Sequence, residues 1–265
     1  MKKYLGIVCL LYSGIFGYVV LFDKLKNFLA PSMQIYLKLS IIPLLVIGII
    51  MLTNKSHYKF KVIDLVLLIP LVFLVLAGDG RLTSSFASNR SGKFNASDRV
   101  KNTDLKEEKE EENKEEKVVD EYDFSNPYFQ INDTNYIDLA YYFAESSKAS
   151  KFIGKTIKVK GFALKDLEFM DSNYFAVGKY EISCCAADAS YIGYIAKYDI
   201  SKITPDKWYE IEGVLDIGKD KEGYDIVYIN VINLKEISSE EQYVYPCYSY
   251  GENACKELEK YNLEN

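Results

Sequence analysis

Three long apolar segments occupy most of the first 80 residues, and they constrain the fold more than any other feature of the chain. They cover residues 4–22, 33–52 and 62–78. At a rise of about 1.5 Å per residue, roughly 20 apolar residues in a helix match the hydrocarbon thickness of a bilayer. The third segment contains Asp64 and Pro70, and proline is tolerated in a membrane helix where a neighbouring helix satisfies the freed carbonyl. The sequence therefore predicts three transmembrane helices within residues 1–80, in contact with the lipid bilayer.

The cations of the short loops predict how these helices cross the membrane. Lysines precede the first segment and fill the loop between the second and third, whereas the first loop has two lysines offset by Asp23. Cytoplasmic loops are enriched in Lys and Arg, so the N-terminus is predicted to be cytoplasmic. A signal peptide is disfavoured because no small-x-small cleavage site follows Phe22. Three crossings make the chain a multi-pass protein of the cell membrane with an extracytoplasmic C-terminal domain.

Charge changes sign along the chain. Residues 1–100 carry a net charge of +8 and residues 101–265 a net charge of −14, within an overall −6. Residues 101–123 alone hold eleven acidic and five basic side chains, with very few apolar ones. Such a segment buries too little apolar surface to offset the entropy lost on ordering. We predict that residues 81–123 are a juxtamembrane segment and a charged flexible linker, which tethers a domain beyond it.

The pattern of apolar residues changes after the linker. Residues 137–147 have helical periodicity, and short alternating or apolar runs typical of strands follow between residues 156 and 237. About five strands at this spacing, with glycines at the expected bends, favour a small closed barrel. We predict a mainly-β domain over residues 124–240, an OB-like five-stranded barrel with a short preceding helix, and a tail over residues 241–265. A β-sandwich is the alternative.

The most unusual local sequence is the pair Cys184 and Cys185, followed by Asp188. Adjacent side chains on a strand point to opposite faces, so the two thiols could bind one metal only if the backbone left extended geometry. Two interpretations stay open: a metal or thiol-redox site formed by these three residues, or a buried thiol beside a turn aspartate. Vicinal cysteines are rare and chemically awkward to keep, which makes this motif the first candidate site.

Two further cysteines, Cys247 and Cys255, lie in the tail. Outside the cytoplasm the four late cysteines allow three pairings, of which the Cys247–Cys255 disulfide is the easiest to form. By chain-entropy arithmetic it would add roughly 2–3 kcal/mol. A four-thiolate zinc site that includes Cys184 and Cys185 is the alternative, although the C-x-x-C pairs typical of such sites are missing. We therefore expect no cofactor, with zinc as the alternative at Cys184 and Cys185.

Familiar catalytic arrangements are absent from the sequence. The only histidine, His57, lies between the second and third apolar segments, so the C-terminal domain can form neither a Ser-His-Asp triad nor a His-rich metal site. The phosphate-binding pattern G-x-x-x-x-G-K-[ST] is also absent. OB-like barrels often bind nucleic acid through basic grooves, but this half of the chain is acidic. We predict that the protein is not an enzyme and has no nucleic-acid partner.

Several stretches together resemble a known family. They cover residues 82–90, 152–162, 180–189, 208–213 and 245–248, and they follow the three apolar segments. The chain is similar to the bacterial family of two-component membrane permease complex subunits, and Cys-Cys-Ala-Ala-Asp-Ala is the most specific shared motif. It departs from that family in the residues that lead into the double cysteine and in a loop whose only histidine is His57.

The resemblance implies a non-enzymatic accessory subunit that works beside a polytopic membrane permease. On this hypothesis Asp64 and Pro70 face the permease, while Cys184, Cys185 and Asp188 carry the function of the extracytoplasmic domain. One alternative is a metal-binding or thiol-redox sensing module, with a link to zinc homeostasis. A second is an extracytoplasmic module that binds nucleic acid or glycan.

Overall fold

The computed structural model describes residues 2–53, 66–70, 72, 82–89, 126–144, 146–165, 167 and 169–246. The chain forms two compact units. The first contains residues 1–81 together with residues 184–188, and the second contains residues 82–183 and 189–265. The segment with the double cysteine thus groups with the N-terminal helices, although the chain on both sides of it belongs to the second unit.

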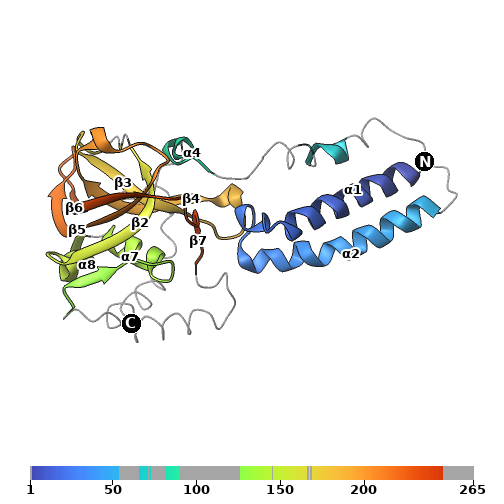
Figure 1. Ribbon diagram of the computed structural model, residues 1–265, viewed down its shortest axis with the longest axis horizontal. Coiled ribbons are helices and arrows are strands. Elements are labelled where there is room, and N and C mark those ends of the chain that lie inside the picture. The colour runs from blue at the N-terminus through green and yellow to red at the C-terminus, as the bar shows by residue number, and fades with distance from the viewer. Residues whose placement is uncertain are drawn as a thin grey trace, which may run out of the picture. The chain divides into compact units, whose positions relative to one another are not determined.

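The first unit is built on two helices. They are α1 (Lys2–Leu21) and α2 (Pro31–Thr53), joined by a turn that contains the 3-10 helix η1 (Leu25–Asn27) (Figure 1). Both are long and apolar enough to cross a membrane, with mean hydropathies of 2.0 and 2.5, and they agree with the first two predicted spans. The third predicted span, residues 62–78, lies mostly outside the described residues.

Small residues allow α1 and α2 to approach closely. A Cβ atom added to Gly48 would lie 2.8 Å from the Leu10 side chain and 3.1 Å from the carbonyl oxygen of Gly6. Further along the pair, the Ser13 hydroxyl donates a hydrogen bond of 3.1 Å to the carbonyl of Ile41. Membrane helices associate through such close backbone contacts and interhelical hydrogen bonds. The sequence of this hairpin is therefore suited to packing in lipid.

Five strands of the second unit close into a barrel, as predicted. Around the ring the order is β2-β3-β4-β6-β5 and back to β2, and only the β4–β6 pair is parallel. This closed ring of five strands is OB-like and excludes the β-sandwich. The barrel strands are β2 (Thr156–Leu164), β3 (Tyr174–Glu181), β4 (Ser190–Lys197), β5 (Trp208–Lys219) and β6 (Asp225–Ile237).

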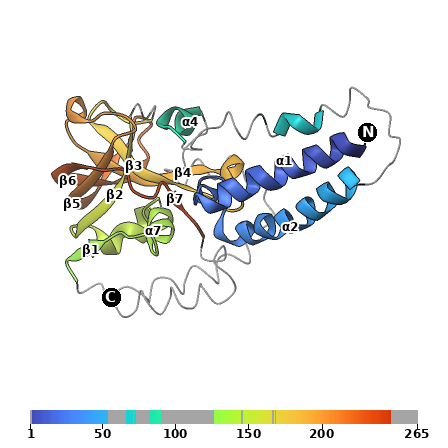
Figure 2. The ribbon, with the colours of Figure 1, turned by 45° about the vertical axis from the view of Figure 1, so that its right-hand side comes forward.

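Short elements complete the second unit. Helix α7 (Tyr136–Phe143) lies against the barrel and confirms the predicted preceding helix (Figure 2). Its aromatic residues join the barrel core, where the Phe143 ring lies 5.2 Å from that of Phe152. The remaining elements are β1 (Tyr128–Gln130), α8 (Ser146–Ala149), η4 (Ser150–Phe152), η6 (Ile200–Lys202) and β7 (Tyr243–Val244).

Glycines allow three neighbouring strands to approach at one point of the barrel wall. A Cβ atom on Gly161 in β2 would lie 2.6 Å from the backbone of Gly178 in β3, and one on Gly178 would lie 2.4 Å from the carbonyl oxygen of Ile192. Gly193 in β4 is equally crowded by the β3 backbone. Any larger residue here would force the strands apart, so these positions fix the curvature that closes the ring.

Residues 82–89, here called the strap, are held on the barrel unit. They include helix α4 (Ser84–Asn89), and the Thr83 carbonyl accepts a 2.7 Å hydrogen bond from the Tyr180 hydroxyl. The Leu82 carbonyl accepts another from the side chain of Gln242. The Phe86 ring packs edge-on against Tyr180, with 5.9 Å between centroids. The strap therefore belongs to the folded domain.

Two predicted boundaries, those of the linker and of the tail, lie next to described elements of the second unit. Residues 90–125 connect two parts of the second unit but lie outside the described residues, so the charged flexible linker predicted there stays a prediction. Beyond residue 240, where the tail was predicted to begin, β7 pairs in parallel with β3.

Candidate functional site

The double cysteine lies in a turn and not on a strand. Strand β3 ends at Glu181, and Cys184 and Cys185 directly precede the 3-10 helix η5 (Ala186–Asp188). The two sulfur atoms are 3.6 Å apart, and neither belongs to a disulfide. Cys184 is exposed and Cys185 is half-buried. The backbone therefore leaves extended geometry at the double cysteine, which was the condition for both thiols to bind one metal.

Asp188 explains this local backbone geometry. Its Oδ2 atom accepts a 2.7 Å hydrogen bond from the backbone N–H of Cys184, and its own N–H donates to the Cys185 carbonyl at 3.0 Å. Aspartate side chains stabilise turns by accepting nearby backbone N–H groups. In the structure Asp188 therefore has a turn role, one of the two roles that the sequence allows for it.

The same carboxylate controls the protonation of Cys184. Its hydrogen bond with the thiol is the main cause that raises the pKa of Cys184 to about 12, and the hydrogen bond with Cys185 is the second. The thiolate is the form of cysteine that attacks electrophiles and binds metals. In this turn Cys184 is consequently a protonated hydrogen-bond donor at neutral pH.

The double-cysteine turn, residues 184–188, is bonded to the turn between α1 and α2. The backbone N–H of Ala30 donates to the Cys184 carbonyl at 3.0 Å, and the N–H of Ala186 donates to the Phe28 carbonyl at 2.9 Å. Ala30 directly precedes α2 and is fully buried. Because the first N–H groups of a helix have no partner within the helix, an acceptor at this position stabilises the start of α2.

Cys185 occupies the centre of this contact. It forms an isolated antiparallel bridge with Leu29, between the two hydrogen bonds. A contact made by the backbone is insensitive to most side-chain changes, but it depends on the shape of the turn. Asp188 holds that shape through its hydrogen bond to the Cys184 N–H, so it supports the contact indirectly.

The other predicted site residues have different outcomes. Asp64, His57, Cys247 and Cys255 lie outside the described residues, so the disulfide and the four-thiolate zinc site stay predictions. Among the residues that the structure does describe, no group of three or more His, Cys, Asp or Glu side chains is arranged to hold a metal ion. Zinc at Cys184 and Cys185 would therefore need a ligand from elsewhere.

Pro70 lies in a described stretch, residues 66–70, that contacts α1. The Tyr12 hydroxyl donates a 2.7 Å hydrogen bond to the carbonyl of Leu67. Residues 66–68 form a 3-10 turn, in which a carbonyl accepts from the N–H three residues later. For Leu67 that position is Pro70, which has no N–H, and Tyr12 supplies the missing donor. The Tyr12 hydroxyl thus supplies, within the first unit, a hydrogen bond to the carbonyl that Pro70 cannot satisfy.

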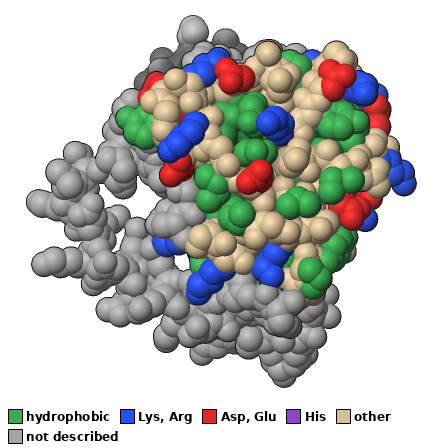
Figure 3. Space-filling view, turned by 90° about the vertical axis from the view of Figure 1, so that its left-hand side faces the viewer, with side chains coloured by type: hydrophobic (Ala, Val, Ile, Leu, Met, Phe, Trp, Pro, Cys, Tyr) green, Lys and Arg blue, Asp and Glu red, His purple; other side chains and the backbone are tan. Residues whose placement is uncertain are grey.

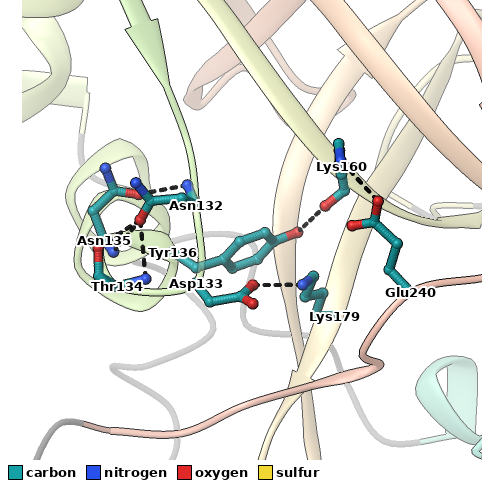
Figure 4. Close-up of polar contacts among 8 residues, drawn as sticks. All are labelled: Asn132, Asp133, Thr134, Asn135, Tyr136, Lys160, Lys179 and Glu240. Carbon is teal, nitrogen blue, oxygen red and sulfur yellow. Dashed lines mark hydrogen bonds and ion pairs between the residues drawn. The ribbon is translucent and has the colours of Figure 1, made fainter.

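A cleft in the second unit gathers charged side chains that the sequence analysis did not single out (Figure 4). Lys179 Nζ lies 2.6 Å from Asp133 Oδ1, and Lys160 Nζ lies 2.7 Å from Glu240 Oε1. The cleft has a volume of about 130 Å³. Its lining residues are Gln130, Ile131, Asn132, Asp133, Tyr136, Lys160, Lys179 and Glu240.

Lys179 is the most unusual member of this cleft, because it is only 3% exposed. It follows the core residues Phe175 and Val177 at alternate positions of β3, and a strand presents alternate residues to the same face. Its ammonium lies 5.5 Å from the centre of the Tyr136 ring and 5.8 Å from that of Trp208. A lysine at a core-facing strand position was the sequence signal that could have found this site.

Side chains also fix the loop that carries Asp133. Asn132 Oδ1 accepts a 3.0 Å hydrogen bond from the N–H of Thr134, and Asn135 Oδ1 accepts a 2.9 Å bond from the N–H of Asn132 (Figure 4). Asn135 also donates to the Gln130 carbonyl at 3.3 Å. The backbone on both sides of Asp133 is therefore held in place, while the Asp133 side chain itself is 61% exposed.

On the face shown in Figure 3, acidic, basic and apolar side chains are interspersed. Cations and anions alternate there without forming a field of one sign. Binding of nucleic acid to a barrel relies on a continuous basic surface along the phosphate backbone. This face therefore lends no support to the nucleic-acid alternative.

Fold and sites together define a class of protein: apolar N-terminal helices long enough to cross a membrane, followed by a closed five-stranded β-barrel. Residues 105–246 match the DUF1980 C-terminal domain, which is more than half of the chain. The chain belongs to this family. No curated protein and no solved structure matches the chain. The matched range includes the barrel, the double-cysteine turn and the cleft.

Proposed function

We propose that the protein is a non-enzymatic accessory subunit of a bacterial membrane permease complex, with its barrel outside the cytoplasm. The observation that carries the proposal is the pair of backbone hydrogen bonds between the double-cysteine turn and the α1–α2 turn. A turn between two barrel strands that bonds to membrane helices can transmit a change in either one to the other. Such coupling suits a subunit that regulates or supplies a neighbouring transport protein.

The same contact supports the proposed orientation. In a two-helix hairpin, the α1–α2 turn lies on one side of the membrane, and Lys2 and Thr53 lie on the other. A cytoplasmic N-terminus puts the turn outside. A segment bonded to that turn would also lie outside, and so would the barrel strands that flank it. The chain then has to cross once more after Thr53, and residues 62–78 are the apolar segment available for it.

Contacts of the third apolar segment are consistent with this crossing. Tyr12 lies near the middle of α1, and its hydrogen bond to the Leu67 carbonyl brings the described stretch 66–70 beside that helix. A third span would then pack against α1 and leave the outer faces of the helices for lipid and for the permease. Asp64 and Pro70 remain the residues that we propose to face the partner.

Labelling with a membrane-impermeant maleimide tests the orientation. In a background without native cysteines, Lys24→Cys in the α1–α2 turn and Lys221→Cys in the barrel unit are expected to react in intact cells. Lys55→Cys is expected to react only after the membrane is permeabilised. If Lys24→Cys and Lys221→Cys were labelled from opposite sides of the membrane, the α1–α2 turn and the barrel unit would not lie on the same side, and the proposed orientation would be refuted.

Purification in mild detergent tests the partnership. The tagged full-length chain, crosslinked in its native membrane, is expected to recover one polytopic membrane protein in near-equal amount. Ala186→Pro removes the N–H that bonds to Phe28, and proline is tolerated at the first position of a helix. Ala186→Gly keeps that N–H and is the matched control. Recovery of the chain alone in every preparation would end the permease proposal.

A second candidate function is thiol-redox sensing, favoured by the 3.6 Å distance between the Cys184 and Cys185 sulfur atoms. Exchange with a small-molecule disulfide would form a Cys184–Cys185 bond, and both protons and electrons would pass to the oxidant, which leaves as two thiols. The turn would change shape and weaken its contact with the α1–α2 turn. Mass spectrometry after equilibration in glutathione buffers checks this. If no Cys184–Cys185 disulfide forms at any ratio of reduced to oxidised glutathione, thiol-redox sensing is excluded.

A further inference from the structure

We propose that the cleft beside α7 binds a small monocarboxylate, whose carboxylate takes the place of Asp133 on the Lys179 ammonium. The proposal goes beyond the permease function and does not depend on it. It rests on the contrast between the two members of this ion pair. Lys179 is fixed inside the protein, whereas Asp133 is a solvent-accessible counter-ion that can be exchanged.

Lys179 provides a fixed positive charge. Its side chain is 4% exposed, whereas that of Asp133 is 61% exposed. The rings of Tyr136 and Trp208 lie within 6 Å of the ammonium, a distance at which aromatic faces attract cations. The ammonium is therefore positioned by the core. Asp133 needs only a rotation of its own side chain to leave.

An ammonium in this environment requires an anion. Removal of one partner from a buried ion pair is strongly destabilising, while replacement of the pair by apolar residues is often neutral or stabilising. The fold itself thus gains little from a lysine at this core-facing position of β3. A lysine whose counter-ion comes from the exposed side is suited to a ligand that supplies the negative charge in its place.

The cleft determines which anion fits. Its volume of about 130 Å³ is roughly ten times the space that one water molecule needs. Lys160 and Glu240 neutralise each other at 2.7 Å, which leaves Lys179 as the cation to be matched. A single negative charge balances it, whereas a dianion such as phosphate would meet the carboxylates of Asp133 and Glu240. Ile131 and the Tyr136 ring offer apolar surface to a short carbon chain.

Asp133 competes with this ligand from within the chain. Because its backbone is held by Asn132 and Asn135, its carboxylate is always present near the ammonium at high effective concentration. Affinity for a free carboxylate is therefore weak in the native protein. Removal of the Asp133 charge should raise that affinity, which is the opposite of what loss of an ordinary structural ion pair would do.

Calorimetric titration of the full-length chain in nanodiscs tests the proposal. The probes are acetate and propionate, with inorganic phosphate as the comparison anion, at constant ionic strength. Asp133→Asn is expected to bind propionate about tenfold more tightly than the native chain. Glu236→Gln is the matched control, since it removes a similarly exposed carboxylate from the Lys207 ion pair outside the cleft. It is expected to leave the affinity unchanged.

Three results would overturn the proposal: no saturable propionate binding to Asp133→Asn, equal effects of Asp133→Asn and Glu236→Gln, or tighter binding of phosphate than of propionate. Lys179→Met is expected to abolish binding. If that variant does not fold, the comparison of the two carboxylate variants still decides. Because co-purification with a permease is a separate readout, failure of either proposal leaves the other intact.

Discussion

Neutralisation of Asp188 tests the structure of the double-cysteine turn most directly. In Asp188→Asn the side chain keeps an oxygen that can accept the Cys184 N–H, but it loses the negative charge. That carboxylate is the main reason why the pKa of Cys184 lies at about 12 instead of its ordinary 9.0. We expect the pKa to fall by about two units, so that the thiolate fraction at pH 8 rises about 100-fold.

The assay is the rate of alkylation by iodoacetamide as a function of pH, because only the thiolate reacts. Cys185 stays in both chains, because its hydrogen bond contributes to the raised pKa, and tandem mass spectrometry of the peptide reads the modification at Cys184. Asp199→Asn is the control. The Asp199 carboxylate also accepts a hydrogen bond from a backbone N–H in its own short turn, that of Ser201, but it lies outside the double-cysteine turn. Equal rates in the parent and in Asp188→Asn, or a parent pKa near 9.0, would refute the reasoning.

The direction of the shift also predicts how the turn responds to pH. The folded turn raises the pKa of Cys184 above its ordinary value, so the protonated thiol stabilises the turn below about pH 9. This stabilisation is lost as the pH rises from about 9 through about 12. The contact between the double-cysteine turn and the α1–α2 turn should therefore have a constant stability near neutral pH and weaken only in strong alkali.

Three substitutions test the packing inside each unit, one in the first unit and two in the second. Gly48→Leu would place side-chain atoms within contact distance of Leu10, so we expect α1 and α2 to separate, at a cost of about 1–3 kcal/mol measured by thermal unfolding in detergent. Gly178→Ala would bring a methyl group to 2.4 Å from a carbonyl oxygen of β4, and a similar loss should appear in the melting of the barrel's circular dichroism. Tyr180→Phe removes the hydrogen bond to the Thr83 carbonyl; we expect a loss of about 1 kcal/mol, and faster proteolysis within the strap while the barrel stays intact.

Local patterns in the sequence were sufficient to predict the main elements of the fold. The lengths of the apolar runs gave α1 and α2, because a membrane helix has a fixed length requirement. Alternation gave the barrel strands, including β2 from residue 156 onward and β5 from Trp208. These properties depend only on neighbouring residues, so a single sequence carries them.

The candidate sites depend on contacts that no local pattern encodes. Cys184 and Ala30 are far apart in the sequence, and their hydrogen bond exists only in the folded chain. The same holds for Lys179 and Asp133, whose pairing requires the loop before α7 to reach β3. The turn at Asp188 was one of two interpretations of the sequence, and the hydrogen bond from the Cys184 N–H to its carboxylate exists only in the folded chain.

Attachment of the strap has a consequence for the acidic run that follows it. Residues 90–125 begin and end on the same folded body, so they form a closed loop whose length sets no distance in the molecule. The entropy cost of such a loop grows only logarithmically, by about 0.6 kcal/mol per doubling. Insertions, deletions and charge changes there can therefore accumulate at little energetic cost.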